Sequence, residues 1–171
     1  HSSHRRQRQM CIRDSTMSQR SLPLAYMVSA GNQAVLGQED FLEFFVDDPL
    51  VRAIGLHIEG LQDVPRFESA ALKALSKGIP VVVLKTGSST IGSELTISHT
   101  GSLSGSAELY EALFARTGII SVSNPSQFLE TLKFLCVVGA PKSKNLVGFT
   151  CSGGGATMLA EYAEKIDLSF F

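Results

Sequence analysis

Short apolar runs recur at regular intervals along the chain, separated by longer segments in which apolar and polar residues are mixed. The short runs predict β-strands over Ala25–Ser29, Ala53–Ile58, Pro80–Lys85, Gly118–Val122 and Leu146–Cys151. The segments between them carry apolar residues three and four positions apart, as at Phe41, Leu42, Phe45 and Val46, which is typical of amphipathic helices. The predicted helices are Gln38–Asp48, Pro65–Gly78, Ser106–Gly118, Pro125–Val138 and Gly155–Lys165.

Prolines and glycines mark the boundaries of these predicted helices. Pro65 and Pro125 stand where helices should begin, and Gly78 and Gly118 stand where helices should end. Strands that alternate with helices through short links indicate a parallel sheet covered on both faces. The pattern therefore predicts an α/β fold, a flavodoxin-like doubly wound parallel sheet.

One boundary between domains is visible in the composition. The stretch "GAPKSKN", residues 139–145, is small, polar and basic between two apolar elements, as a linker would be. Residues 16–138 are therefore expected to form the flavodoxin-like domain. Residues 146–171 are expected to be the truncated start of a second, similar domain, its first βα unit.

The first fifteen residues do not fit the pattern of the rest of the chain. The run "RQMCIRDS", residues 8–15, resembles the translation of a sequencing-library adaptor, and no apolar region of a signal peptide follows the basic lead. Residues 1–15 are therefore expected to be non-native, and the chain to be a metagenomic fragment that also stops abruptly at "DLSFF".

Composition and charge narrow the class of protein. The chain is 44% hydrophobic and 18% charged with a net charge of −1, which is ordinary for a globular domain and offers no basic surface for nucleic acid. No apolar run approaches the roughly 18 residues that a membrane span needs. Outside residues 1–15 the cysteines are Cys136 and Cys151, without the spacing of a disulfide framework or zinc site. A cytoplasmic protein without a metal site or a membrane partner is expected.

Candidate chemistry gathers where the predicted strands end. In a parallel α/β sheet the ligand site lies beyond the carboxyl ends of the strands. Glu59 follows the strand "AIGLHI", the long loop with "SHTGSLSG" and His99 follows "PVVVLK", and "SGGG", Ser152–Gly155, follows "LVGFTC". A carboxylate, an imidazole and two glycine-rich helix N-termini are thus predicted at one edge of the fold.

These groups together suit phosphoryl transfer. A neutral imidazole can attack a phosphoryl group and carry it as a phosphoramidate. Free backbone N–H groups at a helix N-terminus stabilise the phosphoryl charge, and glycines let the backbone approach it closely. A carboxylate on the other ring nitrogen would fix the tautomer of the imidazole.

Each feature taken alone has a simpler explanation. His99 could be a solvated loop residue, Ser152–Gly155 only a tight turn, and Glu59 a strand-end residue that faces water; His57 is taken as structural. A plain flavodoxin-like binding domain would leave the glycine-led helix unexplained. The expected convergence of the three features at one edge favours the phosphoryl site.

The motifs also resemble a known family. "SAGNQA", "DFLEFFVDDP", "HIEG", "IPVVVLKTGSS", "SHTGSLSG" and "LFARTGIISV" follow the order and spacing of the phosphohistidine domain of ADP-forming acyl-CoA synthetases, relatives of succinyl-CoA synthetase. The resemblance implies that His99 is the phosphorylated histidine and that Glu59 orients it. It implies phosphate-binding positions at Thr100, Gly101, Ser152, Gly153 and Gly154, and positions near the acyl substrate or CoA at Asn32, Gly87, Ser88 and Ser89. Where the family often has an arginine, this chain has Ser88.

The resemblance implies a larger enzyme. In the family, acyl-CoA, phosphate and ADP are converted to acid, CoA and ATP, so CoA, ATP or ADP and Mg²⁺ act as substrates and no cofactor is bound tightly. The family's CoA-binding and ATP-grasp domains are absent from this chain and are expected as partners, and the fragment alone is expected to be inactive. The alternative is a non-catalytic CoA- or acyl-CoA-sensing domain of a protein acetyltransferase fusion, in which the relay histidine is typically lost. The presence of both His99 and Glu59 argues against it.

Overall fold

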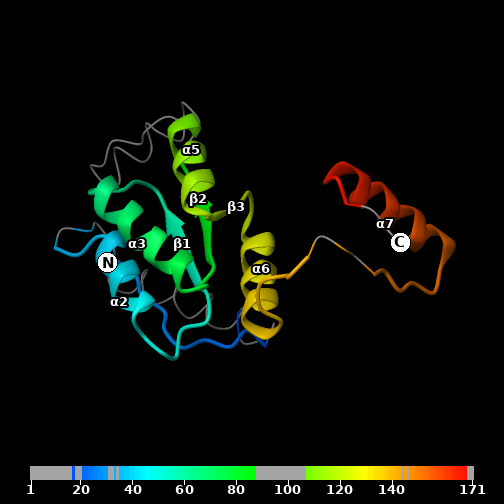
Figure 1. The fold of residues 1–171 in the computed structure, drawn as a ribbon, viewed down its shortest axis with the longest axis horizontal. Coiled ribbons are helices and arrows are strands. Elements are labelled where there is room, and N and C mark those ends of the chain that lie inside the picture. The colour runs from blue at the N-terminus through cyan, green and yellow to red at the C-terminus, as the bar shows by residue number, and fades with distance from the viewer. Residues whose placement is uncertain are drawn as a thin grey trace, which may run out of the picture. The chain divides into compact units, whose positions relative to one another are not determined.

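The chain divides into two compact units, residues 1–139 and residues 140–171 (Figure 1). The computed structural model describes residues 17, 21–30, 33, 35–87, 107–143, 145 and 147–168. The first unit contains the helices α2 (Gln38–Val46), α3 (Val64–Ser76), α5 (Ala107–Thr117) and α6 (Pro125–Val137), and the strands β1 (Ile54–Ile58), β2 (Val81–Lys85) and β3 (Ile120–Val122). The second unit contains α7 (Gly153–Lys165).

The strands of the first unit form a parallel sheet. The described residues give a three-stranded sheet in the order β1-β2-β3, with Ile58 opposite Lys85 and Leu84 opposite Val122. Parallel neighbours need a crossover, which α3 and α5 supply. The carboxyl ends of all three strands therefore meet at one edge, as the sequence predicted.

Helices cover both faces of the sheet. On one face, Val81 and Val83 of β2 pack into a core with the helices α2, α3 and α5, whose members include Leu42, Phe67, Ala74 and Phe114. On the other face, Val82 packs against Leu132 and Leu135 of α6. The unbroken apolar run of β2 is thus explained, because this strand is buried from both sides. The predicted α/β architecture is confirmed.

The predicted helix boundaries have a clear physical basis. The Asp63 carboxylate accepts the N–H of Arg66 at 3.0 Å and caps α3, and the Asn124 side chain accepts the N–H of Gln127 at 2.9 Å and caps α6. Proline stands in the first turn of both helices. Gly78 and Gly118 follow α3 and α5 with φ of 69° and 68°, a left-handed conformation that favours glycine.

The prediction of a strand over Ala25–Ser29 is wrong. Residues 21–30 carry no strand, because no described strand forms a ladder with them. Their apolar side chains pack locally: the Tyr26 ring stacks on Phe45 at 5.2 Å, and its hydroxyl donates to Asp48 at 2.7 Å. The apolar pattern correctly marked a packing segment but not its hydrogen bonding.

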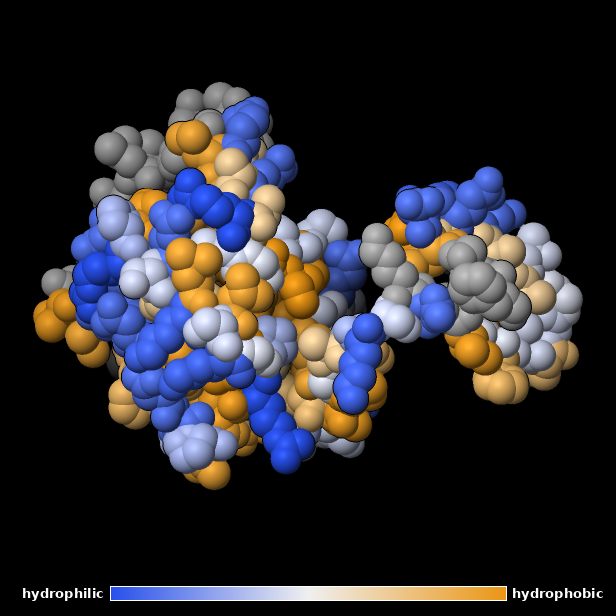
Figure 2. Space-filling view, in the orientation of Figure 1, coloured by the Kyte–Doolittle hydropathy of each residue, from blue (hydrophilic) through white to orange (hydrophobic). Residues whose placement is uncertain are grey.

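The second unit corrects two further predictions. The strand predicted over Leu146–Cys151 is wrong, since residues 147–151 carry no strand. Helix α7 begins at Gly153, two residues before the predicted start at Gly155, because the Ser152 hydroxyl accepts the N–H of Gly155 at 3.0 Å and caps the helix. Apolar side chains remain exposed on this unit (Figure 2), among them Val147, Phe149, Met158, Tyr162 and Ile166.

Candidate functional site

The predicted site residues fall into two groups. The structure describes Glu59 and Gly87 in the first unit, and Ser152, Gly153 and Gly154 in the second. The remaining predicted positions lie outside the described residues; they are Asn32, Ser88, Ser89, His99, Thr100 and Gly101.

Two neighbouring strand ends bring Glu59 close to the start of the segment that contains His99. Glu59 directly follows β1, and Thr86 directly follows β2. The N–H of Thr86 donates to the carbonyl of Ile58 at 3.0 Å, which extends the ladder to this edge. Gly87 then has φ of 74°, so the chain leaves β2 through a conformation that favours glycine. Glu59 thus lies beside the point from which residues 88–106 depart.

Lys85 ties these two strand ends together. It is the last residue of β2, and its Nζ donates to the carbonyl of Glu59 at 2.9 Å and to the carbonyl of Thr86. The same Nζ lies 4.6 Å from the centroid of the Tyr110 ring. Burial lowers the pKa of Lys85, and attraction to the Glu59 charge partly opposes this shift.

Tyr110 of α5 holds the other side of the same turn. Its hydroxyl accepts the N–H of Leu61 at 3.2 Å, and only 7% of the residue is exposed. Burial raises the pKa of Tyr110, and the bond from Leu61 partly opposes the shift. Sequence reasoning identified neither Lys85 nor Tyr110 as part of the site. Lys85 ends an apolar run and Tyr110 has helical spacing to Phe114, so both follow an ordinary core pattern.

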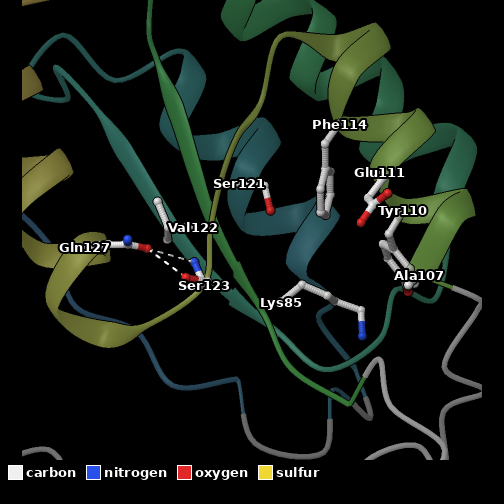
Figure 3. A pocket seen from close by; sticks show the side chains of 9 residues that line it. All are labelled: Lys85, Ala107, Tyr110, Glu111, Phe114, Ser121, Val122, Ser123 and Gln127. Carbon is white, nitrogen blue, oxygen red and sulfur yellow. Dashed lines mark hydrogen bonds between the residues drawn. The ribbon is translucent and has the colours of Figure 1, made fainter. Parts of the chain in front are cut away.

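A cavity of about 340 Å³ lies next to Lys85, between α5 and the end of β3 (Figure 3). Its lining combines charged, polar and aromatic side chains: Lys85, Ala107, Tyr110, Glu111, Phe114, Ser121, Val122, Ser123 and Gln127. The Ser123 hydroxyl donates to the Gln127 side chain at 2.9 Å, so these two groups satisfy each other. The volume is at the lower end of the range for small-molecule pockets, about 300–1,000 Å³. Among the described residues no group of three or more His, Cys, Asp or Glu side chains could hold a metal ion.

In the second unit, the N-terminus of α7 is open to an incoming group. A Cβ built on Gly153 or Gly154 would meet no atom within 4 Å, so the space beside these residues is free of described neighbours. A Cβ on Gly155 would clash with the Thr150 hydroxyl, so a side chain at this position would require Thr150 to move. An exposed helix N-terminus with free N–H groups can bind an anion such as a phosphate.

Comparison with known proteins assigns the family. A model of the family described as succinyl-CoA ligase like flavodoxin domain matches residues 10–135. Because the match covers most of the chain, the protein belongs to this family. The predicted resemblance to ADP-forming acyl-CoA synthetases and relatives of succinyl-CoA synthetase is confirmed.

Individual relatives carry related names. The chain is 36% identical over 148 residues to the alpha subunit of ADP-forming acetate–CoA ligase I from Pyrococcus furiosus, covering 86% of this chain and 32% of the relative. It is 38% identical over 134 residues to ADP-forming acetate–CoA ligase from Methanocaldococcus jannaschii, covering 78% of this chain and 19% of the relative. A solved structure of dinucleotide forming acetyl-coenzyme A synthetase 1 from Ca. Korarchaeum cryptofilum, in complex with phosphate and ADP, matches with a TM-score of 0.76 and 29% identity. That match covers 84% of this chain and 31% of the solved one.

These matches confirm the flavodoxin-like fold class of the chain. The chain spans about a third or less of the length of these three relatives. The relatives are named as acid–CoA ligases and synthetases, which does not favour the alternative of a sensing domain. In the part of the chain that the structure describes, no helix combines the length and apolarity required to cross a membrane.

Proposed function

We propose that this chain is the phosphohistidine domain of an ADP-forming acyl-CoA synthetase and relays a phosphoryl group between an acyl phosphate and ADP. The family membership supports this assignment, as do the names of the relatives. The structural observation that carries it is the position of Glu59, which follows β1 beside the end of β2, from which the segment with His99 departs.

The proposed relay has one covalent step on this chain. A ring nitrogen of His99 attacks the phosphorus of the acyl phosphate, an N–P bond forms, and the bond from phosphorus to the carboxylate oxygen breaks. The acid leaves as a carboxylate, and the other ring N–H stays hydrogen-bonded to Glu59, which stabilises the positive charge that develops on the ring. A second in-line transfer passes the phosphoryl group from His99 to ADP and restores the neutral imidazole.

The phosphoryl group needs donors that do not compete as nucleophiles. We assign this role to the backbone N–H groups of Thr100 and Gly101, which follow His99 in the sequence. In the second unit we propose Gly153 and Gly154 as phosphate-binding positions at the start of α7, where the N–H of Ser152 already donates to the Thr150 hydroxyl at 3.3 Å. The open space next to Gly153 and Gly154 supports the assignment, because a side chain at either position would narrow the approach.

The other substrates require parts beyond this chain. In the proposal, CoA, the acid and phosphate meet at the carboxyl edge of the sheet near Asn32, Gly87, Ser88 and Ser89, and Mg²⁺ accompanies ADP or ATP. A CoA-binding domain and an ATP-grasp domain supply the remaining contacts, in the cytoplasm. Acetate is the first acid to test, because the relatives are named for acetate.

Labelling of the complete synthetase, in which this segment is joined to those domains, tests the proposal. Incubation with Mg²⁺ and ATP labelled on its γ-phosphate should give a phosphoprotein that is labile to acid and stable to base, with the label on His99. The His99→Ala variant should lose both the label and the turnover of acetyl-CoA, whereas His57→Ala should keep the label. Label that persists on the His99→Ala variant would place the nucleophile elsewhere and refute the relay.

A further inference from the structure

We infer that Lys85 and Tyr110 form a backbone clamp that positions Glu59 for the phosphoryl relay; this inference rests on the proposed function. The clamp holds the turn Glu59–Gly60–Leu61 from two sides. Lys85 donates to the carbonyl of Glu59 at 2.9 Å, and Tyr110 accepts the N–H of Leu61 at 3.2 Å. The two bonds fix both ends of the short turn from which the Glu59 carboxylate projects.

The clamp joins three elements that meet at the carboxyl edge. Lys85 comes from β2, Tyr110 comes from α5, and the turn that they hold follows β1. The two clamp residues also contact each other, since the ammonium of Lys85 lies 4.6 Å from the centroid of the Tyr110 ring. A cation that faces an aromatic ring at this distance is attracted to it, so each member of the clamp restrains the other.

The surroundings of Lys85 indicate a fixed ammonium rather than a solvated one. Its side chain is half-buried, and its bonds run to the carbonyls of Glu59 and Thr86. Hydrogen bonds from a charged donor are stronger than neutral ones and compensate for the lost hydration of the ammonium. A partly buried ammonium that donates to main-chain carbonyls fixes the backbone at those two positions.

The clamp also sets the two flanks of the segment that contains His99. Thr86, whose carbonyl Lys85 binds, precedes residues 88–106, and α5, which carries Tyr110 in its first turn, follows them. The two clamp residues therefore lie on the elements that precede and follow the segment containing the proposed partner of Glu59. The position of the Glu59 carboxylate has to be precise, because a displacement of about 1 Å at a reacting centre can lower the rate by about 10²-fold.

The ordinary alternative is that Lys85 only closes the end of a strand and stabilises the fold. A double-mutant cycle separates the two roles, because residues that act through one another are non-additive. The measured quantity is the rate of His99 phosphorylation by Mg²⁺ and ATP in the complete synthetase, with Lys85→Met and Glu59→Gln made singly and together. Lys73→Met is the matched control. Lys73 lies in the last turn of α3, at the opposite edge of the sheet, and its ammonium pairs with the Asp47 carboxylate at 2.7 Å.

Positioning of Glu59 makes a specific prediction for this cycle. Lys85→Met should slow phosphorylation by about tenfold or more in the wild-type background and by less than about threefold when Glu59 is already glutamine. Lys73→Met should keep the wild-type rate. Equal losses in both backgrounds, or a wild-type rate in the Lys85→Met protein, would overturn the clamp. If Glu59→Gln alone has no effect, the proposed role of Glu59 fails as well.

A second variant keeps the inference testable if Lys85→Met does not fold. Tyr110→Phe keeps the ring beneath the ammonium and removes only the hydroxyl that accepts the N–H of Leu61. It should slow phosphorylation by about threefold to tenfold, again with less effect when Glu59 is glutamine. A folded Tyr110→Phe protein with the wild-type rate would refute the part of the clamp that acts on Leu61.

Discussion

Replacing Glu59 by glutamine tests the residue that we propose to orient His99. The substitution keeps the size of the side chain and removes its charge. Because Lys85 binds the main-chain carbonyl of Glu59 and not the carboxylate, the clamp bond at 2.9 Å is retained in the variant. Glu59→Gln should therefore keep the fold, with at most a small loss of stability from the missing attraction between the Glu59 charge and Lys85, and a loss of rate in the folded variant belongs to the missing charge.

The size of that loss depends on the exposure of Glu59. The residue is partly exposed, so its attraction for an imidazolium about 4 Å away lies between about 1 kcal/mol in water and about 4 kcal/mol near a protein surface. A value in the lower half of this range, about 1.4 kcal/mol, corresponds to a tenfold change in rate. We expect phosphorylation of His99 to slow by at least about tenfold. This lower bound is smaller than the effect typical of a general base, which is about 10²- to 10⁴-fold.

Rapid-quench measurement of the labelled phosphoprotein after mixing the complete synthetase with Mg²⁺ and ATP gives the rate directly. Circular dichroism and thermal unfolding of the same preparation establish that the variant is folded. Wild-type phosphorylation kinetics in a folded Glu59→Gln protein would mean that Glu59 is a solvated residue at a strand end and does not orient His99.

Three further predictions concern the isolated chain and two of its turn glycines. The purified 171-residue chain alone should form no ATP from acetyl-CoA, ADP and phosphate, because the CoA-binding and ATP-grasp domains that we propose to align the substrates are not among these residues. Steady turnover in a coupled ATP assay would contradict this. Gly78→Ala should lower the free energy of unfolding by about 1 kcal/mol, because alanine disfavours the φ of 69° at this position. The added Cβ would have no atom within 4 Å, so the cost comes from the backbone conformation and not from a clash. Gly118→Ala should cost at least as much in the same denaturant titration, because its φ is 68° and the exposed Leu75 side chain, with Cδ1 2.9 Å from the added Cβ, would also have to move.

The sequence predicted the architecture where local pattern and tertiary packing agree. The apolar run at Val81–Lys85 is buried on both faces, and the alternation at Ile54–Ile58 matches a strand with one face in the main core. The caps Asp63 and Asn124 are local signals, so the starts of α3 and α6 were predicted within about a residue. Ala25–Ser29 failed as a strand because a strand exists only through a partner, and periodicity carries no information about pairing.

The candidate site was predictable only in part, for a related reason. The position of Glu59 followed from the order of strands and helices, since consecutive parallel strands lie side by side and end at one edge. Lys85 and Tyr110 could not be identified in this way. Their roles depend on hydrogen bonds to main-chain groups 26 and 49 residues away. Every residue other than proline has the same main-chain N–H and carbonyl, so the sequence does not indicate which of these groups are bonded.

Residues that support a site through the main chain, such as Lys85 and Tyr110, can change without any change in the fold. The carboxylate comes from Glu59 alone. In the inferred clamp its direction depends on Lys85, which bonds to the carbonyl of Glu59, and on Tyr110, which bonds to the N–H of Leu61. A change of Lys85 or Tyr110 to an apolar residue of similar size would preserve the apolar pattern of β2 and α5, and with it the sheet and its helices. It would release the turn at Glu59 while leaving every predicted site residue in place. In the proposal, a chain with an intact histidine and glutamate can therefore lose the relay through its supporting residues, so Lys85 and Tyr110 belong with His99 and Glu59 among the residues that a working site would require.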